Sequence, residues 1–362
     1  MPVADRYEIV TDARGLRALE AEWNALWARA GDDYVTSSFA WCVHAWEQMA
    51  QPLGRRLYTL VARDAAGRLT LVWPLVQYRY GPWRRARPLG PEVAEYSSIL
   101  VERGPEMAER LAAAFAHVRR TARCDQIILP FVNDGSPLHA LIEAHGGAVT
   151  RAETPTNATC PPEQGGDDGF LQKLQSASIE KRRRKLERRG ELRYEQVTDP
   201  QRRAEIIAWL VGTKEERLVR GGEHALWKRT ELYREFLTAV SADERVPVFA
   251  LTLDGATLAA SIARVDNRRF ESFISTWDDE YKNFSVGQIL RIENMRWAFA
   301  RGLEYDLRVG DQEYKREWTN RHGVAVSYNV PLTAWGAVVT ALRGAQRSLG
   351  RVRSRLRLRP AA

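Results

Sequence analysis

The stretch that decides the fold runs from Trp277 to Trp318 and reads WDDEYKNFSVGQILRIENMRWAFARGLEYDLRVGDQEYKREW. Three runs with strand character end at Trp277, a loop leads to Gly287, and the apolar spacing predicts a helix at Gln288–Arg301. A strand at Leu303–Val309 follows. Most of the polar side chains with useful chemistry therefore gather where a sheet meets the N-terminus of a helix.

The three runs before this stretch have the pattern of an antiparallel meander. Turn residues stand at Asp254-Gly255 and Asn267-Arg268. The predicted elements of this half are strands at Arg193–Val197, Val246–Leu253, Thr257–Val265, Arg269–Trp277 and Ala325–Val330, with earlier helices at Pro200–Leu218 and Trp227–Val240.

The first half of the chain repeats this order. Its predicted strands are at Tyr7–Val10, Leu57–Ala62, Leu69–Tyr78, Tyr96–Val101, Gln126–Phe131 and from Ala148 onward. Its predicted helices are one over Leu16–Trp27, one capped by Ser37 or Ser38 that runs through Trp46, and two at Pro105–Thr121 and Pro137–His145. Because the order occurs twice, we predict two α/β domains of like topology. The Pro- and Gly-rich segment Thr154–Asp168 is the predicted linker, which places the domains at residues 1–160 and 161–335.

Residues 336–362 are predicted to be a basic amphipathic tail. Apolar residues recur at alternating spacings of three and four, as on one face of a helix: Trp335, Val338, Leu342, Ala345, Leu349, Val352 and Leu356. The positive charge comes from Arg343, Arg347, Arg351, Arg353, Arg355, Arg357 and Arg359. Such a helix either lies on an anionic membrane surface or docks on the protein's own surface.

Composition restricts the class of protein. With 362 residues and 44% hydrophobic content, the chain is too long for one typical core and apolar enough to fill two. Its net charge of +8 suits anionic partners. Cys42, Cys124 and Cys160 are far apart without a CxxC spacing, which favours a reducing compartment. No signal-peptide pattern opens the chain, so a cytoplasmic location is expected, with peripheral contact at the inner face of the membrane as an extension.

Two runs carry a resemblance to a known family. YKNFSVGQIL (281–290) leads into the helix that Gly302 closes, and YDLRVGDQEYK (305–315) covers the next strand. Ser38–Trp41 and Glu95-Tyr96 add weaker matches. With the meander, these runs resemble GNAT acyltransferases, and in detail the BioF2-like or CelD/BcsL acetyltransferases, relatives of the FemAB aminoacyltransferases. The resemblance implies tandem GNAT-like domains, each a mixed, mainly antiparallel twisted sheet flanked by helices, with one strand splayed from its neighbour.

The helix that begins near Ser285 is the predicted donor site. Its unpaired N–H groups and positive dipole end suit a pyrophosphate or phosphopantetheine phosphate, and glycine at 287 would allow close approach of the backbone. We expect acetyl-CoA or another acyl-CoA, as co-substrate, to bind at Trp277, Lys282, Ser285, Val286, Gly287 and Gln288. The family's loop reads Q/R-x-x-G-x-G/A. Because serine replaces its first glycine here, an acyl carrier protein or an aminoacyl-tRNA stays an alternative donor.

Acyl transfer to an amine needs a base, a polarised carbonyl and an acid for the leaving thiolate. Asp306 and Asp311 flank the end of the strand nearest the donor helix, and one of them is the expected base or ammonium binder. Asp311 has the alternative of capping the helix Gln312–Glu317. Lys315 would hold an oxyanion or a phosphate, or be a solvated helix lysine. Tyr314 would protonate the thiolate or simply pack.

The resemblance to FemAB-like proteins also implies an acceptor site between the paired domains. Glu95, Tyr96 and Ser97 are the candidates there, with ordinary surface-loop residues as the alternative. His224, which follows Gly221-Gly222, is a further candidate base on a lid. The basic run Lys181–Arg189 is either a solvated helix face or a contact for RNA or a phosphorylated donor.

These expectations describe an N-acyltransferase that moves an acyl group to a small-molecule amine, with an amino sugar or another envelope or polysaccharide precursor implied by the resemblance. One alternative is a FemAB-like aminoacyl-tRNA-dependent transferase. Another is a non-catalytic membrane-surface binding or assembly protein with the GNAT fold. The histidines and cysteines show no metal-ligand spacing, so no metal is expected.

Overall fold

The computed structural model describes residues 5–30, 34–91, 96–161, 177–221, 230–338 and 340–341. The elements of the N-terminal half are β1 (Arg6–Val10), α1 (Ala13–Ala18), α2 (Glu20–Ala30), η1 (Val35–Ser37), α3 (Phe39–His44), the π-helical turn η2 (Ala45–Ala50), β2 (Arg56–Arg63), β3 (Leu69–Tyr80), β4 (Trp83–Pro88), β5 (Leu100–Val101), α4 (Met107–Thr121), β6 (Gln126–Asn133), α5 (Pro137–His145) and β7 (Thr150–Thr159).

The elements of the C-terminal half are α7 (Ala177–Glu187), β8 (Leu192–Gln196), α8 (Pro200–Arg220), α9 (Thr230–Val240), β9 (Val248–Leu253), β10 (Ala256–Val265), β11 (Arg269–Trp277), η4 (Asp279–Phe284), α10 (Val286–Phe299), β12 (Glu304–Val309), α11 (Glu313–Glu317) and β13 (Arg321–Pro331).

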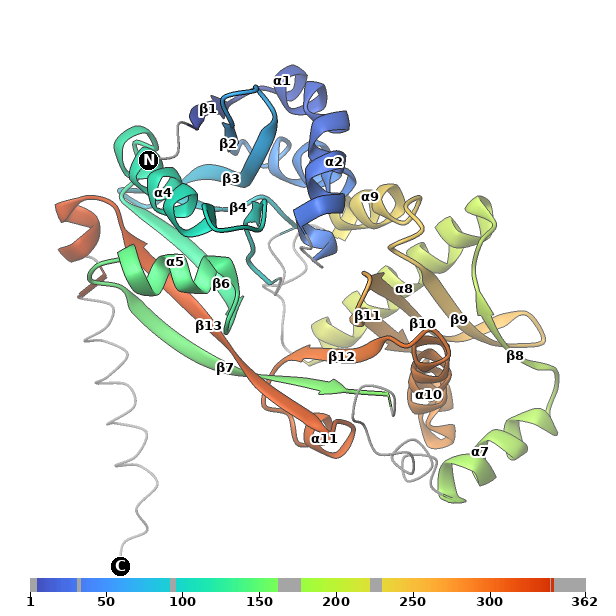
Figure 1. Cartoon of the computed structure of the whole chain (residues 1–362). Helices are drawn as coiled ribbons and strands as arrows, with labels where there is room; N and C mark the ends of the chain where they lie inside the picture. Colours follow the sequence, from blue (N-terminus) through green and yellow to red (C-terminus); the bar gives the residue numbers. More distant parts are fainter. Residues whose placement is uncertain are drawn as a thin grey trace, which may run out of the picture.

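The thirteen strands found in the described residues form one sheet, in the order β1-β2-β3-β4-β6-β13-β7-β12-β11-β10-β9-β8, with β5 on β3 (Figure 1). Two neighbouring pairs, β4–β6 and β11–β12, are parallel, and the other pairs are antiparallel. The predicted α/β class, with mixed and mainly antiparallel sheet flanked by helices, is confirmed.

The two halves exchange strands at the middle of this sheet. β13, from the C-terminal end of the chain, lies between β6 and β7, and β7 pairs in turn with β12. The predicted linker is therefore wrong over Thr154–Thr159, which belongs to β7. Prolines suggested a loop there, but a strand tolerates proline where its missing N–H is not needed, and the Pro155 carbonyl still accepts a hydrogen bond from the Gly310 N–H at 2.9 Å. Residues 162–176 lie outside the described part.

The halves also share a hydrophobic core. One cluster of buried side chains joins α2, α3 and η2 to α8, α9 and β11. At its centre the Trp41 ring meets Phe236 and Phe273 edge-on, with centroids 5.0 and 5.5 Å apart. Ser38, in the same family-like run as Trp41, caps α3 through its side chain. That run is therefore a structural contact between the halves.

Helices cover both faces of the C-terminal sheet. Alternate residues of β10 face opposite ways, as strand geometry requires. Ala260 and Ile262 belong to the core on the side of α8 and α9, and Ala259 and Ala263 pack on the side of α10. Figure 1 shows α10 in front of this sheet and α8 behind it. The edge between β11 and β12 is thus flanked by a helix on each side.

Two predictions in the first half need correction. Of the strand expected at Tyr96–Val101, two residues form β5. β4 was not predicted, because its sequence WRRARP lacks the alternation of apolar residues that marks a strand. The three cysteines are buried and form no disulfide.

The predicted tail is described only at its beginning. Residues 334–338 and 340–341 are helical, and the Gln126 side-chain amide donates to the Thr340 hydroxyl at 2.7 Å. Trp335 and Val338 are exposed there. The residues from Leu342 onward, which carry the predicted basic charge, lie outside the described part. No helix within the described ranges has the length and apolar character needed to cross a bilayer.

Candidate functional site

Strands β11 and β12 form a fork. They pair in parallel at three positions, ending with Glu271 opposite Asp306. β11 then continues to Trp277 and β12 to Val309 without further pairing between them. The splayed strand that the family resemblance implied is therefore present, and the fork opens toward the N-terminus of α10.

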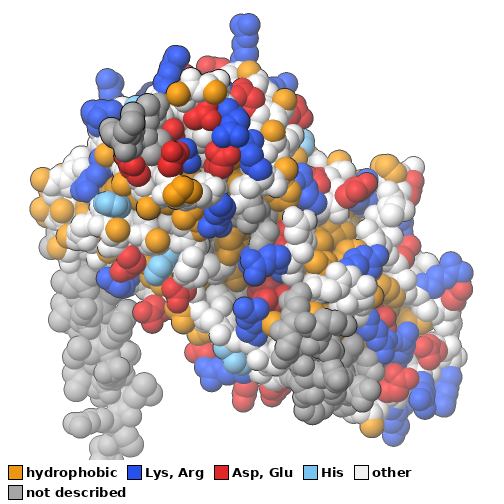
Figure 2. Space-filling view, viewed as in Figure 1, with side chains coloured by type: hydrophobic (Ala, Val, Ile, Leu, Met, Phe, Trp, Pro, Cys, Tyr) orange, Lys and Arg blue, Asp and Glu red, His pale blue; other side chains and the backbone are white. Residues whose placement is uncertain are grey.

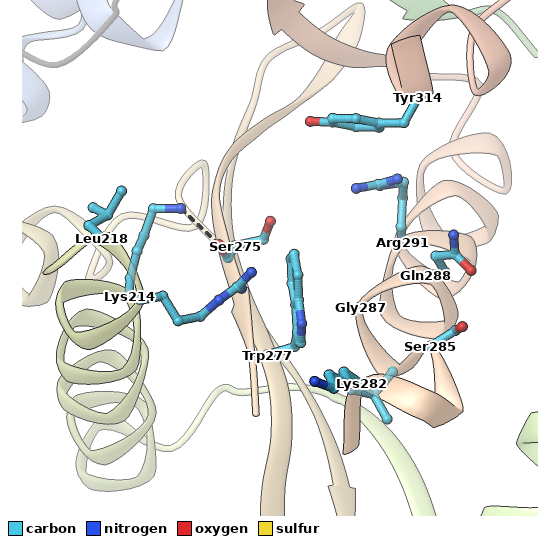
Figure 3. Close-up of a pocket in the computed structure, with 12 residues that line it drawn as sticks. Lys214, Leu218, Ser275, Trp277, Lys282, Ser285, Gly287, Gln288, Arg291 and Tyr314 are labelled. Carbon is cyan, nitrogen blue, oxygen red and sulfur yellow. Dashed lines mark hydrogen bonds between the residues drawn. The ribbon is translucent and has the colours of Figure 1, made fainter. Parts of the chain in front are cut away.

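A cavity of about 590 Å³ occupies the open side of the fork (Figure 3). Its walls come from α8, the end of β11, the start of α10 and α11. The lining residues are Lys214, Arg217, Leu218, Ser275, Trp277, Lys282, Ser285, Val286, Gly287, Gln288, Arg291 and Tyr314. All six residues predicted for the donor thus lie together in this cavity, which we call the fork cavity.

The fork cavity is strongly basic. Four cations line it, Lys214, Arg217, Lys282 and Arg291, and its described lining contains no carboxylate. The Arg217 guanidinium lies 3.5 Å from the Trp277 ring centroid, and burial lowers the pKa of this arginine. The Lys214 ammonium donates to the Ser275 carbonyl at 3.1 Å (dashed in Figure 3). An anionic ligand would meet four cationic side chains here, of which Arg217 also lies 3.5 Å from the Asp279 carboxylate.

Ser285, at the start of α10, explains how this chain departs from the glycine pattern. Its backbone is left-handed, with φ 56°, a conformation usually given to glycine. The hydroxyl makes no capping bond and accepts instead from the Arg182 guanidinium on α7. The first N–H groups of α10 have no partner within the helix and lie at its positive end. Serine can therefore replace the glycine without closing this end of the helix.

Gly287 has a packing role. A Cβ built on Gly287 would lie 2.9 Å from the Trp277 ring, closer than side-chain carbons approach. The absence of a side chain lets the indole lie against the first turn of α10. The sequence suggested close approach of a phosphate as the reason for glycine. The structure adds Trp277 as a second reason.

Asp306 does not line the fork cavity. It lines a separate cavity of about 290 Å³ between the two halves, with Tyr34 and Tyr96 of the N-terminal half. Its carboxylate is buried, with 5% exposure, and accepts a hydrogen bond from the Arg308 N–H at 2.5 Å. Burial, reinforced by Glu271, raises the pKa of Asp306 to about 6, although Arg269 acts in the opposite direction.

A network of buried charges surrounds the apex of the fork. Glu271 is bound by Arg264 and lies 2.7 Å from Arg308. Burial would raise the pKa of Glu271, but these two arginines hold that pKa below its ordinary value. Arg308 has a positive φ of 65° at an irregularity in the β7–β12 pairing. Such strained backbone is often found at functional sites.

The other three predicted catalytic residues have different surroundings. Lys315 is buried and donates to the Val309 carbonyl at 2.6 Å; burial, helped by Arg308, lowers its pKa to about 8. Asp311 is exposed and pairs with Arg316. The alternative role predicted for Asp311 is wrong, because Gln312 occupies the N-cap position of α11. Tyr314 is 42% exposed, and its ring lies across the fork cavity in Figure 3.

The predicted acceptor residues are only partly described. Tyr96 lines the cavity that contains Asp306. Ser97 donates to the Pro130 carbonyl and lines a much smaller pocket beside Tyr96. Glu95 and His224 lie outside the described residues.

Sequence reasoning missed the contribution of α8. Lys214, Arg217 and Leu218 are spaced three and four residues apart and so share one helical face, which is a signal that the sequence contains. It also missed Arg291, in the second turn of α10, and the contact of Arg182 with Ser285. Arg182 and Ser285 are 103 residues apart in the sequence, so no local sequence pattern indicates their contact.

Two other arginines of the basic run on α7 form ion pairs. Arg183 pairs with Glu187 and Glu293, and Arg184 pairs with Glu180. Figure 2 shows basic and acidic side chains intermixed over the lobe that carries α7. Within the described residues no group of three His, Cys, Asp or Glu side chains is placed to hold a metal ion.

Comparison with known proteins identifies the C-terminal half. Residues 174–316 match the family model described as "Acetyltransferase (GNAT) domain", so the chain contains a GNAT acetyltransferase domain. No curated protein matches the sequence significantly.

Solved structures resemble the whole chain in fold. FemX superposes with a TM-score of 0.56 and 12% identity, over 90% of this chain and 97% of FemX. A tandem GNAT protein from the clavulanic acid biosynthesis pathway superposes with a TM-score of 0.52 and 15% identity, over 91% of this chain and 99% of that protein. L-PGS from Bacillus licheniformis superposes with a TM-score of 0.53 and 9% identity, over 89% of this chain and 96% of L-PGS. At these identities the likeness concerns the fold, and it extends over both halves.

Proposed function

We propose that this chain is an N-acyltransferase that takes an acyl group from a thioester donor, acetyl-CoA or a longer acyl-CoA, and transfers it to an amine. The observation that carries the proposal is the fork cavity, which combines four cations and no described carboxylate with the N-terminus of the GNAT domain's α10. Phosphates of the donor would meet Lys282 and the free N–H groups of α10. The thioester would lie deeper in the fork.

The reaction forms a C–N bond and breaks the C–S bond of the thioester. The acceptor amine loses a proton and the thiolate gains one. For the base we favour Asp306 over Asp311, because Asp306 is buried at the fork apex whereas Asp311 is exposed and paired with Arg316. Tyr314, which lines the fork cavity, is the proposed acid. Lys315, held by the Val309 carbonyl, is proposed to keep the fork open.

The acceptor's identity rests on the family resemblance, which suggests an amino sugar or another envelope or polysaccharide precursor. We carry this class forward as part of the proposal. We also propose that the chain belongs to the BioF2-like or CelD/BcsL branch of these enzymes.

A thermal-shift screen tests the donor assignment. Acetyl-CoA, longer acyl-CoAs and free coenzyme A should each raise the melting temperature, because a ligand at 100 times its dissociation constant adds about 2.7 kcal/mol of stability. Lys282→Gln should reduce the shift. Lys185→Gln, on the exposed face of α7, should not change it. If none of these compounds raises the melting temperature of the wild-type chain, the donor assignment is wrong.

A second candidate, aminoacyl-tRNA-dependent transfer, is favoured by one contact. Arg182, within the basic run of α7, reaches Ser285 at the edge of the fork cavity, so the run borders the proposed donor site. This alternative predicts RNA binding that weakens steeply with salt and depends on Arg182, Arg183 and Arg184. A filter-binding titration of the chain with tRNA at several salt concentrations distinguishes the two functions, because an acyl-CoA-dependent enzyme is expected not to bind RNA in this way.

A further inference from the structure

Exposed apolar and aromatic side chains gather at one end of the N-terminal half. Among the described residues six large side chains of this kind are prominently exposed, and three of them are Tyr80, Trp335 and Val338, with exposed fractions of 50%, 52% and 48%. Tyr80 ends β3 at the tight turn into β4. The other two are three residues apart and share one face of the C-terminal helix, residues 334–338 and 340–341. Figure 1 shows this helix at the left edge of the molecule, and Figure 2 shows hydrophobic side chains exposed at that edge.

A series of contacts joins the β3–β4 hairpin to the C-terminal helix. The Asp125 carboxylate accepts hydrogen bonds from the Arg84 N–H at 2.9 Å and from the Thr333 hydroxyl at 3.1 Å. The next residue, Gln126, accepts from the Arg85 guanidinium at 3.2 Å and donates to the C-terminal helix through the bond described above. The hairpin and the helix therefore belong to one surface.

The aromatic rings of the hairpin are held at this surface by a buried arginine. The Tyr80 and Trp83 rings stack with their centroids 6.4 Å apart, and the Arg85 guanidinium lies 4.1 Å from the Tyr80 ring centroid. Arg85 is itself only 5% exposed, so the core fixes its position. Aromatic rings that are held in place and yet exposed are typical of a surface that meets a partner, because such rings combine apolar area with a polar tip.

The same surface is basic. β3 and β4 contain no carboxylate, and Arg79 and Arg84 are exposed beside the turn. The sequence that continues from the C-terminal helix, residues 342–362, adds seven arginines and no acidic side chain. Apolar residues recur within it at the spacing of one helical face. A partner for this surface must therefore offer negative charge and apolar contact together.

We propose that this end of the molecule docks on an anionic phospholipid bilayer. The docking surface, which we call the basic aromatic surface, consists of Arg79, Tyr80, Trp83, Arg84, Trp335 and Val338. Tyrosine and tryptophan rings suit the headgroup level of a bilayer, and arginines are attracted to its negative surface. RNA would satisfy the charge and would stack on the rings, but it offers no apolar environment to Val338 or to the leucines of residues 342–362. This inference does not depend on the proposed acyl transfer.

Co-sedimentation of the full-length chain with vesicles tests the docking. Vesicles of phosphatidylcholine alone are compared with vesicles in which a third of the lipid is phosphatidylglycerol. The anionic vesicles should bind at least about tenfold more tightly, because each arginine near an anionic surface contributes about fivefold, the equivalent of about 1 kcal/mol. Binding should weaken as the salt concentration rises.

Variants locate the surface that meets the lipid. Tyr80→Ser and Val338→Ser should each weaken binding to the anionic vesicles about threefold or more, because each removes apolar area that the bilayer covers. Val219→Ser is the matched control, at a valine that is 46% exposed near the end of α8, outside this surface. Arg84→Gln keeps the backbone N–H that binds Asp125 and should weaken binding about fivefold. Arg193→Gln removes an exposed charge on β8, at the far edge of the sheet, and should have little effect.

Equal binding to the two kinds of vesicle would overturn the proposal. Unchanged binding in both Tyr80→Ser and Val338→Ser would overturn it as well, because lipid binding would then belong to residues outside the basic aromatic surface. Binding of tRNA that Tyr80→Ser weakens, without binding to either vesicle, would make this surface an RNA site instead. Far-ultraviolet circular dichroism checks folding of the variants, and the comparison of vesicles with the unaltered chain needs no variant. Because no acyl donor is present, these outcomes are independent of the donor screen.

Discussion

Asp306 owes its properties to the fork. It is the last residue of β12 that pairs with β11, so its side chain is enclosed by neighbours from both halves, yet it has no ion-pair partner among the described residues. Its ordinary pKa is 3.8, and burial raises the native value to about 6. Between these two values the native state binds a proton that the unfolded chain has released. The contribution of Asp306 to stability therefore falls as pH rises from about 4 to about 6.

The variant Asp306→Asn should make this dependence visible. Relative to wild type, it should gain free energy of unfolding on the order of 2 kcal/mol between pH 4 and pH 7, because asparagine carries no charge to bury. Urea unfolding at intervals of pH measures the difference, and groups common to both proteins largely cancel. A difference that does not change with pH would show that Asp306 titrates normally.

Arg182 and Ser285 form a contact whose effect should appear in donor binding. Arg182→Gln removes the guanidinium that holds the Ser285 hydroxyl at the start of α10. The dissociation constant for acetyl-CoA should rise about three- to tenfold, in keeping with roughly 0.5–1.5 kcal/mol for one hydrogen bond. Arg184→Gln is the control, since Arg184 is exposed and pairs with Glu180 within α7. If both variants bind the donor equally well, this contact has no part in the donor site.

At the scale of elements, the first turn of α10 depends on Gly287. Alanine in an exposed helix position normally stabilises by about 0.5–1 kcal/mol relative to glycine. At Gly287 the added methyl would press on the Trp277 ring, so we expect no gain in stability and at least about fivefold weaker donor binding. Gly212, within α8, has nothing within 4 Å of its Cβ position.

Gly212→Ala should therefore show the full helix gain and leave donor binding unchanged. Thermal unfolding and acetyl-CoA titration of both variants provide the comparison. Equal stabilisation by the two substitutions would mean that the Trp277 ring moves aside freely.

The elements of the C-terminal half were largely predictable from the sequence. Their strands have clear apolar alternation, and the predicted Arg269–Trp277 coincides with β11. Predictions failed where local pattern and tertiary role diverge. β4 is rich in arginine but is paired on both sides. Pro155 of β7 resembles the start of a linker, although that strand lies in the middle of the sheet.

The site was predictable to the extent that it is local in sequence. The six residues predicted for the donor lie between Trp277 and Gln288 in sequence and line one cavity. Residues brought in by tertiary packing were missed, including Lys214 and Arg217 of α8. The prediction also grouped Asp306 with Tyr314, because the strand that carries Asp306 and the segment after it were expected to end beside the donor site. β12 and α11 direct these two side chains into different cavities.

At the scale of the whole molecule, the strand exchange joins the two halves. With β13 between β6 and β7, and Trp41 packed on Phe273, the halves share both a sheet and a core. A site built from both halves, such as the cavity that contains Asp306, needs a fixed relation between them. The strand exchange supplies this relation. The fork then stands between two cavities, one lined by four cationic side chains and one that contains the buried carboxylate of Asp306.

The central claim is that the fork cavity binds a phosphate-bearing acyl thioester. Calorimetric titration of the wild-type chain with acetyl-CoA and with acetyl-pantetheine, which keeps the thioester but lacks the phosphates, tests it directly. If the claim is right, acetyl-CoA binds and acetyl-pantetheine binds at least about tenfold more weakly, because the cations and the N-terminus of α10 attract the phosphates that acetyl-pantetheine lacks. Failure of acetyl-CoA to bind, or equal affinity for the two compounds, would contradict the claim.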